Sequence, residues 1–355
     1  MITTVAMRTI SRCHTSLVLM ASLLLSACTT APIKTVPNVP EQKVQPVQEV
    51  DVLSMLIARQ DRIYRVAAPL MVKNAPLCRS LARPLLGFTA KNRYSYPAEL
   101  APAVESALKL DDRLRVMQVL DGSGAMRAGI RPGDILQSVQ DQPLPRGPQA
   151  ENEAARLLLP LLKNTNDIAI QVLRGDRPIR LTIPLTAACA FSMEIGHAPQ
   201  VNAYADGRRI MITTGMLDFL GSDEELAVIL AREIAHNVLQ HASSQQMTAT
   251  IASVIDALLP LKPDTAALAG RGGLRPMSAK ADQEADRLAM YLLARAGYDP
   301  AATERTMEKI AQAYPVSQTN TYTALHPWTP ERRQSIQAAL SEIRQKQASK
   351  SPLLP

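Results

Sequence analysis

The sequence is poor in aromatic residues, in metal-ligating residues and in long runs of a single charge. Phenylalanine, tyrosine and tryptophan make up only 3% of the 355 residues, with a single tryptophan. The formal net charge is +7, but there is no run of Lys or Arg and no alternation of basic with aromatic residues. Nucleic-acid recognition needs such a basic stripe, so we expect no nucleic acid among the partners. Only four cysteines and five histidines are present, which leaves few candidate metal ligands.

One apolar run stands out, and it lies at the N-terminus. Residues 1–27 have two arginines followed by a short apolar stretch, which predicts a signal peptide rather than a membrane span. The stretch ends in Leu-Ser-Ala-Cys, which looks like a bacterial lipobox with Cys28 as the acylated residue. The alternative is an ordinary secretory signal with a chance cysteine. Thr29 follows, and by analogy we expect a lipid anchor in the outer membrane, facing the periplasm. Residues 28–50, rich in proline, are predicted to be a disordered tether.

Two cysteines remain for the folded part of an exported chain. Cys78 and Cys189 would meet an oxidising compartment, where a disulfide is the default. The alternative is a pair of buried free thiols. Between these cysteines the sequence pattern is typical of short strands and turns. Residues 51–80 instead have apolar residues spaced by three and four, which predicts an amphipathic helix. We expect that helix to pack on the C-terminal domain.

The segment between the cysteines contains Gly-Ser-Gly-Ala at 122–125 and Pro-Gly-Asp-Ile at 132–135. With Ala128-Gly129 between them, these residues resemble the signature of HtrA-type PDZ domains. The resemblance implies a PDZ-like domain over 81–188 that binds a peptide C-terminus and adds the peptide as a strand. The matching carboxylate loop consists of Leu85, Leu86, Gly87 and Phe88. The alternative is a spacer of PDZ shape that has no ligand.

The chain is organised around an apolar helical stretch at 226–241 that contains Arg232-Glu233-Ile234-Ala235-His236. In the H-E-x-x-H motif, two histidines one helical turn apart bind zinc and the glutamate is the general base. Glu233 and His236 stand at the expected places, but Arg232 occupies the position of the first histidine. A guanidinium has no lone pair to give to a metal and stays protonated. The motif is therefore recognisable and chemically broken.

Four stretches together resemble the HtpX- and BepA-like zinc metallopeptidases of metallopeptidase family 48. They are NAYADGRRIMITTGML from 202, the helix around Glu233, EADRLAMYLLARAGYDP from 284 and HPWTPERR from 326. The resemblance implies a gluzincin domain over 189–347, followed by a disordered tail over 348–355. It implies zinc as the cofactor, with His236 and the residue at 282 as ligands and His326 near the metal. Asp282 replaces the glutamate expected of the family, which shortens the reach of that ligand.

The resemblance also assigns other positions. Asp286 is the last acid of the family motif and would lie just outside the metal ligands, and the strand that pairs with substrate would be the edge formed by Arg209, Ile210, Met211, Ile212 and Thr213. His241 lies about 140° round the helix from His236, so we expect it to support the ligands or the fold rather than to bind the metal. The resulting fold class is α+β: a mainly helical metallopeptidase-like domain with a small edge sheet, plus an inserted PDZ-like domain.

Three functions compete on this evidence. The chain could be an active zinc endopeptidase of periplasmic or outer-membrane quality control, with Glu233 and His326 as catalytic residues. It could be a degenerate peptidase that binds peptides or partner proteins, with zinc weak or absent. A third hypothesis is a purely structural envelope protein. We favour the degenerate peptidase, because Arg232 removes a ligand and adds a fixed positive charge. We further expect carboxylates of Glu233, Asp282 or Asp286 to pair with that charge.

Overall fold

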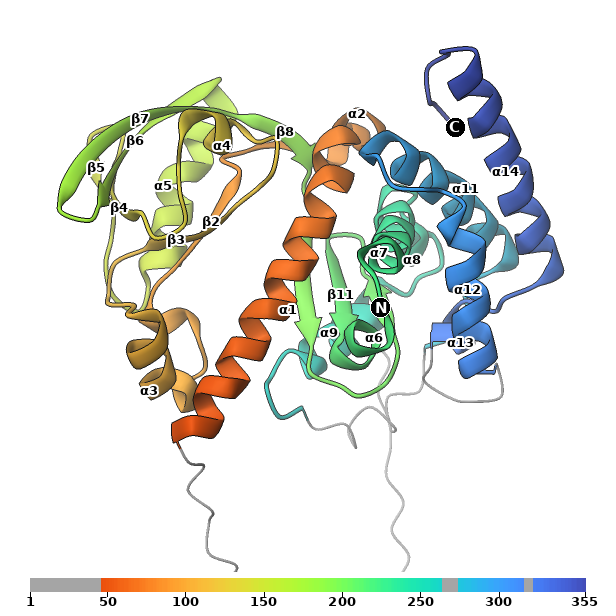
Figure 1. Ribbon diagram of the computed structural model, residues 1–355, viewed down its shortest axis with the longest axis horizontal. Coiled ribbons are helices and arrows are strands. Elements are labelled where there is room, and N and C mark those ends of the chain that lie inside the picture. Colours follow the sequence, from red (N-terminus) through yellow and green to blue (C-terminus); the bar gives the residue numbers. More distant parts are fainter. Residues whose placement is uncertain (1–45, 264–273, 316–321) are drawn as a thin grey trace, which may run out of the picture. The chain divides into compact units, whose positions relative to one another are not determined.

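The computed structural model describes residues 46–263, 274–315 and 322–355, and it confirms the α+β class (Figure 1). The signal segment, Cys28 and most of the tether lie outside the described residues. The end of the tether differs from the prediction, because helix α1 begins at Pro46 rather than after residue 50. A proline is tolerated in the first turn of a helix, and Glu49 lies where the helix dipole favours a negative charge.

The helices of the described residues are short except for α1, α7, α11 and α14. Those before the central helix are α1 (Pro46–Lys73), α2 (Ala75–Cys78), α3 (Ala101–Ala103), α4 (Gly124–Ala128), α5 (Ala150–Asn164) and α6 (Thr214–Phe219). From the central helix onward they are α7 (Asp223–Val238), α8 (His241–Ser244), α9 (Thr248–Leu258), α11 (Ala279–Ala296), α12 (Ala302–Ala313), α13 (Tyr322–Leu325) and α14 (Pro330–Ala348).

The middle of the chain forms a strongly twisted antiparallel sheet with its own apolar core, as expected for the PDZ-like unit. The strand order is β2-β3-β4-β6-β7, with the short strand β5 (Gln142–Pro143) paired to β4. The other strands are β2 (Phe88–Lys91), β3 (Arg115–Val119), β4 (Ile135–Val139), β6 (Asp167–Arg174) and β7 (Arg177–Pro184). Ile168, Ile170 and Val172 alternate inward along β6 and pack with α4 and α5. This core is separate from the core around α7.

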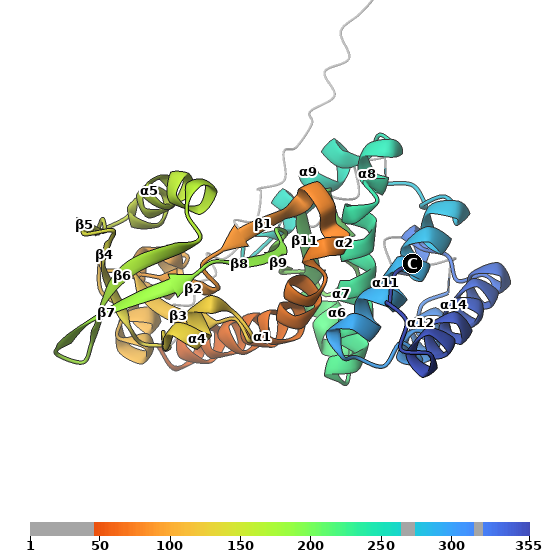
Figure 2. The ribbon, with the colours of Figure 1, turned by 90° about the horizontal axis from the view of Figure 1, so that it is seen from above.

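The chain enters and leaves the PDZ-like unit through one antiparallel strand pair, which Figure 2 shows from above. Strand β1 (Ala82–Leu85) pairs with β8 (Thr186–Cys189), so the two ends of the insertion lie side by side. Cys78 and Cys189 form a disulfide across this junction, with their Cα atoms 5.5 Å apart. The disulfide therefore closes the loop that contains the whole unit.

The C-terminal part has a three-stranded sheet in the order β10-β11-β9, formed by β10 (Ala203–Ala205), β11 (Arg209–Thr213) and β9 (Ser192–Gly196). The prediction that residues 209–213 form a substrate-binding edge is wrong. Strand β11 is central, with β10 antiparallel on one side and β9 parallel on the other. Four of its five residues are buried, as a strand paired on both sides requires. The free edges belong to β9 and β10.

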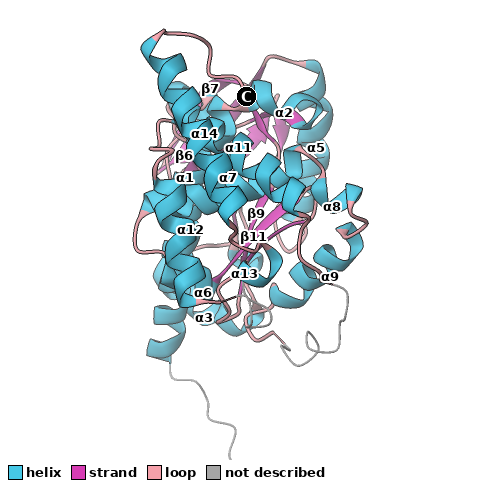
Figure 3. Ribbon diagram, turned by 90° about the vertical axis from the view of Figure 1, so that its right-hand side faces the viewer, coloured by secondary structure: helices cyan, strands magenta, loops and turns pink. Residues whose placement is uncertain are grey.

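Helix α7 is enclosed on all sides and lies in the centre of the C-terminal part. Every residue from Leu226 to Asn237 is buried, which is the pattern of a helix enclosed by other elements. Its start is marked by Ser222, whose side chain accepts a hydrogen bond from the Glu225 N–H at 3.2 Å. Helix α11 packs against α7, and α14 packs against α11, as Figure 3 shows. Helix α1 packs its buried Ile63, Val66 and Leu70 into the same core.

The C-terminal residues differ from the predicted disordered tail. They turn back onto α11 and α14: Arg295 donates a hydrogen bond to the Leu353 carbonyl at 3.3 Å, and Lys346 donates to the Leu354 carbonyl. Leu353 also contacts the apolar cluster between these helices. The backbone carbonyls of the tail thus have positively charged donors, which the sequence pattern did not indicate.

Candidate functional site

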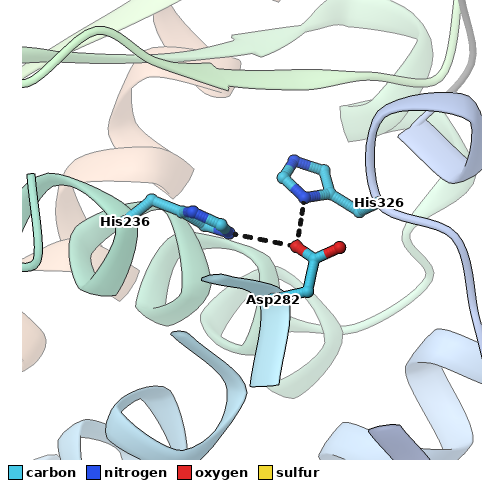
Figure 4. Close-up of side chains that lie close together, drawn as sticks. All are labelled: His236, Asp282 and His326. Atoms are coloured by element: carbon cyan, nitrogen blue, oxygen red, sulfur yellow. Dashed lines mark hydrogen bonds and ion pairs between the residues drawn. The ribbon is translucent and has the colours of Figure 1, made fainter. Parts of the chain in front are cut away.

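Three side chains that the sequence analysis singled out converge in the interior of the C-terminal part (Figure 4). His236 comes from α7, Asp282 from the first turn of α11, and His326 follows α13. His326 Nδ1 lies 2.7 Å from Asp282 Oδ1, and His236 Nε2 lies 3.6 Å from the same oxygen. Their ligand atoms all lie within 4.8 Å of one another, and all three residues are buried. Two imidazoles and a carboxylate form a donor set that can hold a divalent transition metal.

His241 contacts the imidazole of His236 and orients it, which is the supporting role expected from its position. Its Nδ1 lies 3.0 Å from Nδ1 of His236, and its Nε2 lies 3.3 Å from Glu284 Oε2. A carboxylate accepts hydrogen bonds, so we assign the proton of His241 to Nε2 and that of His236 to Nδ1. This tautomer leaves a lone pair on Nε2 of His236. That nitrogen is buried and has no hydrogen-bond partner among the residues that the structure describes.

Arg232 lies beside this set rather than within it. Its side chain is fully buried, and Nε donates to Asp286 Oδ1 at 2.6 Å. Nη2 donates to Asp282 Oδ1 at 3.3 Å, the same oxygen that accepts from His326. Nη1 donates to the Tyr322 hydroxyl. Of the three carboxylates expected to pair with Arg232, the two aspartates do so directly, whereas Glu233 bonds to the Tyr322 hydroxyl at 3.2 Å.

A second buried arginine completes the cluster, and the sequence analysis gave it no role. Arg332 on α14 makes a bidentate pair with Asp286, at 2.7 Å from Nε to Oδ2 and 2.9 Å from Nη2 to Oδ1. Its Nη1 also donates to the carbonyls of His326 and Pro327. The only available signal was the position of Arg332 within the HPWTPERR stretch. Tyr322, the other missed residue, carried no sequence signal.

The electrostatics of the cluster favour a charged Asp282 and a neutral His236. Burial raises the pKa of Asp282, but His326, Arg232 and Arg332 outweigh burial and hold it well below its usual value. Burial, together with the neighbouring His326 and Arg232, lowers the pKa of His236 well below its usual value. Burial raises the pKa of Glu233, although His326 and Arg232 oppose the rise. Burial would lower the pKa of Arg232, but Tyr322, Asp286 and Asp282 raise it above its usual value.

These observations test whether the site suits the zinc ion that the sequence resemblance implies. The free lone pair of His236 and the nearby His326 are suitable donors. The carboxylate is not free, because Asp282 Oδ1 already accepts from Arg232 and from His326. Arg232 and Arg332 already supply two positive charges to the buried Asp282 and Asp286, so a divalent cation would add further positive charge beside Arg232. The residues present therefore fit a metal-free cluster of paired charges better than a catalytic zinc centre.

A small cavity of about 10 Å³, room for roughly one water molecule, lies against Glu233, His236 and His326. Strand β10 lines this cavity together with apolar side chains from α9 and neighbouring segments. The edge strand beside the site is thus β10, and it takes the place that the sequence analysis gave to residues 209–213.

The predicted carboxylate loop of the PDZ-like unit connects β1 to β2. Gly87 has φ +88°, and a Cβ added there would lie 2.4 Å from Cβ of Ser123, so only glycine fits. The Gly87 carbonyl accepts from the Leu120 N–H at 2.8 Å, and Leu86 packs into the core of the unit. The loop lies far along the chain from the α7 cluster and contributes nothing to it.

The C-terminal part of the chain is similar to a known family. Residues 181–340 match the model of Peptidase family M48, and this match starts eight residues before the predicted domain boundary. The chain is 31% identical over 118 residues to the mitochondrial metalloendopeptidase OMA1 of Arabidopsis thaliana, covering 32% of this chain and 24% of the relative. It is 28% identical over 127 residues to the beta-barrel assembly-enhancing protease of Escherichia coli K12, covering 31% and 26%. The chain thus spans about a quarter of the length of these two relatives.

Among solved structures, the chain is similar to the HtrA-type protease AlgW with decapeptide, at 24% identity over 30% of each chain with a TM-score of 0.23. It is also similar to the HtrA3 PDZ domain bound to a phage-derived ligand, at 19% identity over 30% of this chain and 88% of the other, with a TM-score of 0.22. Within the described residues, no helix combines the length and apolarity needed to cross a bilayer.

Proposed function

We propose that this chain is a member of peptidase family M48, whose model matches residues 181–340, and that it has exchanged hydrolysis for binding. The observation that carries the proposal is the guanidinium of Arg232, which is fully buried and hydrogen-bonded to both Asp282 and Asp286. It stands at the motif position of a zinc ligand and uses the carboxylate that the metal would need. The function left to the fold is recognition of peptides or partner proteins.

The charge of the site supports this proposal. Arg232 stays protonated at any working pH, and its neighbours raise its pKa further. The ion is held between α7 and α11, so it serves as the central cation that docks the two helices. Glu233, the general base of an active enzyme, bonds instead to Tyr322 and is kept by burial at a raised pKa.

The test is to restore the motif. As purified without chelator, the unaltered protein should contain far less than one zinc per chain and should not cleave unfolded protein. Arg232→His supplies the missing imidazole, and Asp282→Glu added to it restores the reach of the second ligand. We expect the double variant to take up about one zinc per chain and to unfold at a higher temperature with added metal. The double variant with Glu233→Gln is the control, because it should bind zinc without gaining hydrolysis.

A second candidate, an active zinc endopeptidase, has one observation in its favour. His236 Nε2 is buried without a partner and lies in a set with Asp282 and His326 that could hold a metal. Zinc bound there would supply an activated water and a positive charge for the developing oxyanion. One tightly held zinc in the unaltered protein, with cleavage that Glu233→Gln abolishes, would replace our proposal with this one.

The setting that we propose is the bacterial envelope. The lipobox at Cys28 supports an outer-membrane lipid anchor, and the loop Leu85–Phe88 supports capture of a peptide C-terminus by the PDZ-like unit. Binding of a C-terminally free peptide, lost on amidation of that peptide, would test the second point. Equal binding of both forms would contradict it.

A further inference from the structure

Strand β9 has a free edge, although it belongs to a sheet in the interior of the protein. Its partner is β11 alone, in parallel register. The Ser192 N–H donates to the Arg208 carbonyl on the β11 side. Backbone groups alternate in direction along a strand, so the N–H and C=O of Met193 and Ile195 point away from β11. Within the described residues, these two have no backbone hydrogen bond outside regular structure.

The edge of β9 forms part of the wall of a cavity of about 490 Å³, which we call the β9 cleft. Helix α1 lines it with Leu56, Ile57, Gln60, Asp61 and Tyr64, and strands β2 and β3 form another wall. A volume of about 300–1,000 Å³ is typical of pockets that hold a small ligand, so the cleft has room for a short stretch of polypeptide. The cleft is distinct from the cavity at His236, with which it shares no lining residue.

Two buried polar atoms in the cleft lack a hydrogen-bond partner within the described residues. Nε2 of Gln60 is a donor, and Oε1 of Gln118 is an acceptor. The orientation of the Gln118 amide follows from its Nε2, which donates to Asp61 Oδ1. A buried donor or acceptor without a partner costs about 1–3 kcal/mol, so each of these atoms calls for a partner such as a ligand group or an ordered water. One donor and one acceptor are the complement of a peptide group.

The cleft also presents negative charge. Asp61 and Glu194 both line it, and neither forms an ion pair within the described part of the chain. Arg65, the nearest cation that acts on Asp61, is paired with Asp223 instead. The Glu194 carboxylate accepts only from Ser192 Oγ, at 2.9 Å. The cation on the opposite wall, Lys91, is already paired with Glu151 at 3.2 Å.

We propose that the β9 cleft binds an extended polypeptide segment that carries a lysine or arginine, and that this segment adds to β9 as a further strand. Main-chain hydrogen bonds to Met193 and Ile195 would hold the segment in register. Its basic side chain would meet Asp61 and Glu194, and Gln60 and Gln118 would pair with one of its peptide groups. The site goes beyond the proposed function, since it uses neither the α7 cluster nor the carboxylate loop.

The probe for the test is a fluorescent hexapeptide of alternating valine and lysine, acetylated and amidated so that it offers no free C-terminus. Its binding to the full chain is followed by fluorescence anisotropy. Alternating valine and glutamate provides the charge control. Two further peptides remove the N–H groups along one edge at a time. One is N-methylated on its valines, and the other is N-methylated on its lysines. We expect the lysine peptide to bind at least about tenfold more tightly than the glutamate peptide, and one N-methylated form to lose binding.

Variants of the cleft locate the site. Asp61→Asn and Glu194→Gln should each weaken binding of the lysine peptide by about two- to fivefold, the range of partly exposed ion pairs. Thr89→Trp, on the opposite wall, should abolish binding by filling the cleft. Thr182→Trp is the matched control, because it places the same side chain at an exposed strand position away from the cleft.

Photocrosslinking keeps the inference testable if Thr89→Trp does not fold. A benzophenone at the central lysine should label β9 or α1, identified by mass spectrometry of the digested protein. Labelling of Ala203–Ala205 or Leu85–Phe88 instead, or equal binding of all peptides, would overturn the inference. The zinc experiment above has a separate readout, so either proposal can fail without the other.

Discussion

Replacement of Arg232 by methionine should destabilise the protein strongly, although methionine is apolar and of similar length. The guanidinium is fully buried and pairs with Asp286 at 2.6 Å and Asp282 at 3.3 Å. Removing one partner of a buried ion pair costs about 3–5 kcal/mol of unfolding free energy, because the other charge remains buried. Here Asp286 keeps its bidentate pair with Arg332, and Asp282 keeps His326. We therefore expect the free energy of unfolding to fall by about 3 kcal/mol, the lower limit of this range.

The assay is urea unfolding followed by far-UV circular dichroism, with zinc and chelator tested separately. For a domain of 150–250 residues, a loss of 3 kcal/mol corresponds to a fall in Tm of roughly 6–12 °C. The control is Arg59→Met, which breaks a pair with Asp218 in which Arg59 is half-buried and Asp218 is exposed. That change should cost less than about 1 kcal/mol. If Arg232→Met unfolds at the same urea concentration as the unaltered protein, the guanidinium does not act as the central cation of the site.

Three further predictions concern other parts of the molecule. Arg287, Lys346 and Tyr291 hold the pKa of Glu342 at about 2, so its stabilising effect should be complete above pH 4.5 and lost as the pH falls toward 2. Because this carboxylate is only partly buried, the free energy of unfolding of Glu342→Gln in urea should differ from that of the unaltered protein by less than about 1 kcal/mol, and a difference that grows on acidification would contradict the assignment. The Cys78–Cys189 disulfide closes a loop of 111 residues, so its reduction should lower the free energy of unfolding by up to about 4–5 kcal/mol. The control is the double serine variant, whose stability should not respond to reductant. Cys28→Ala should release the protein from the outer-membrane fraction, and retention after a salt wash would indicate another anchor.

The sequence alone determined the elements whose causes are local. The apolar stretch around Glu233 was predicted to be a helix, and α7 covers most of it. The apolar spacing of residues 51–80 likewise predicted helix α1, which begins at Pro46 and ends at Lys73. These features depend on residues within a few positions of one another, so they can be read without knowing where the rest of the chain lies.

The tertiary structure decided the features that depend on distant residues. Residues 209–213 look like a strand from their sequence, but only the sheet order shows that β11 is central and that β9 and β10 have the free edges. In the same way, Arg232 indicated a broken zinc motif from the sequence alone, but its hydrogen-bond partners depend on how the helices pack. Tyr322 and Asp286 lie 90 and 54 residues away along the chain, and Arg332 reaches Asp286 from a third element. A buried charge pairs with the groups that the fold places beside it, and the local sequence does not indicate which groups these are.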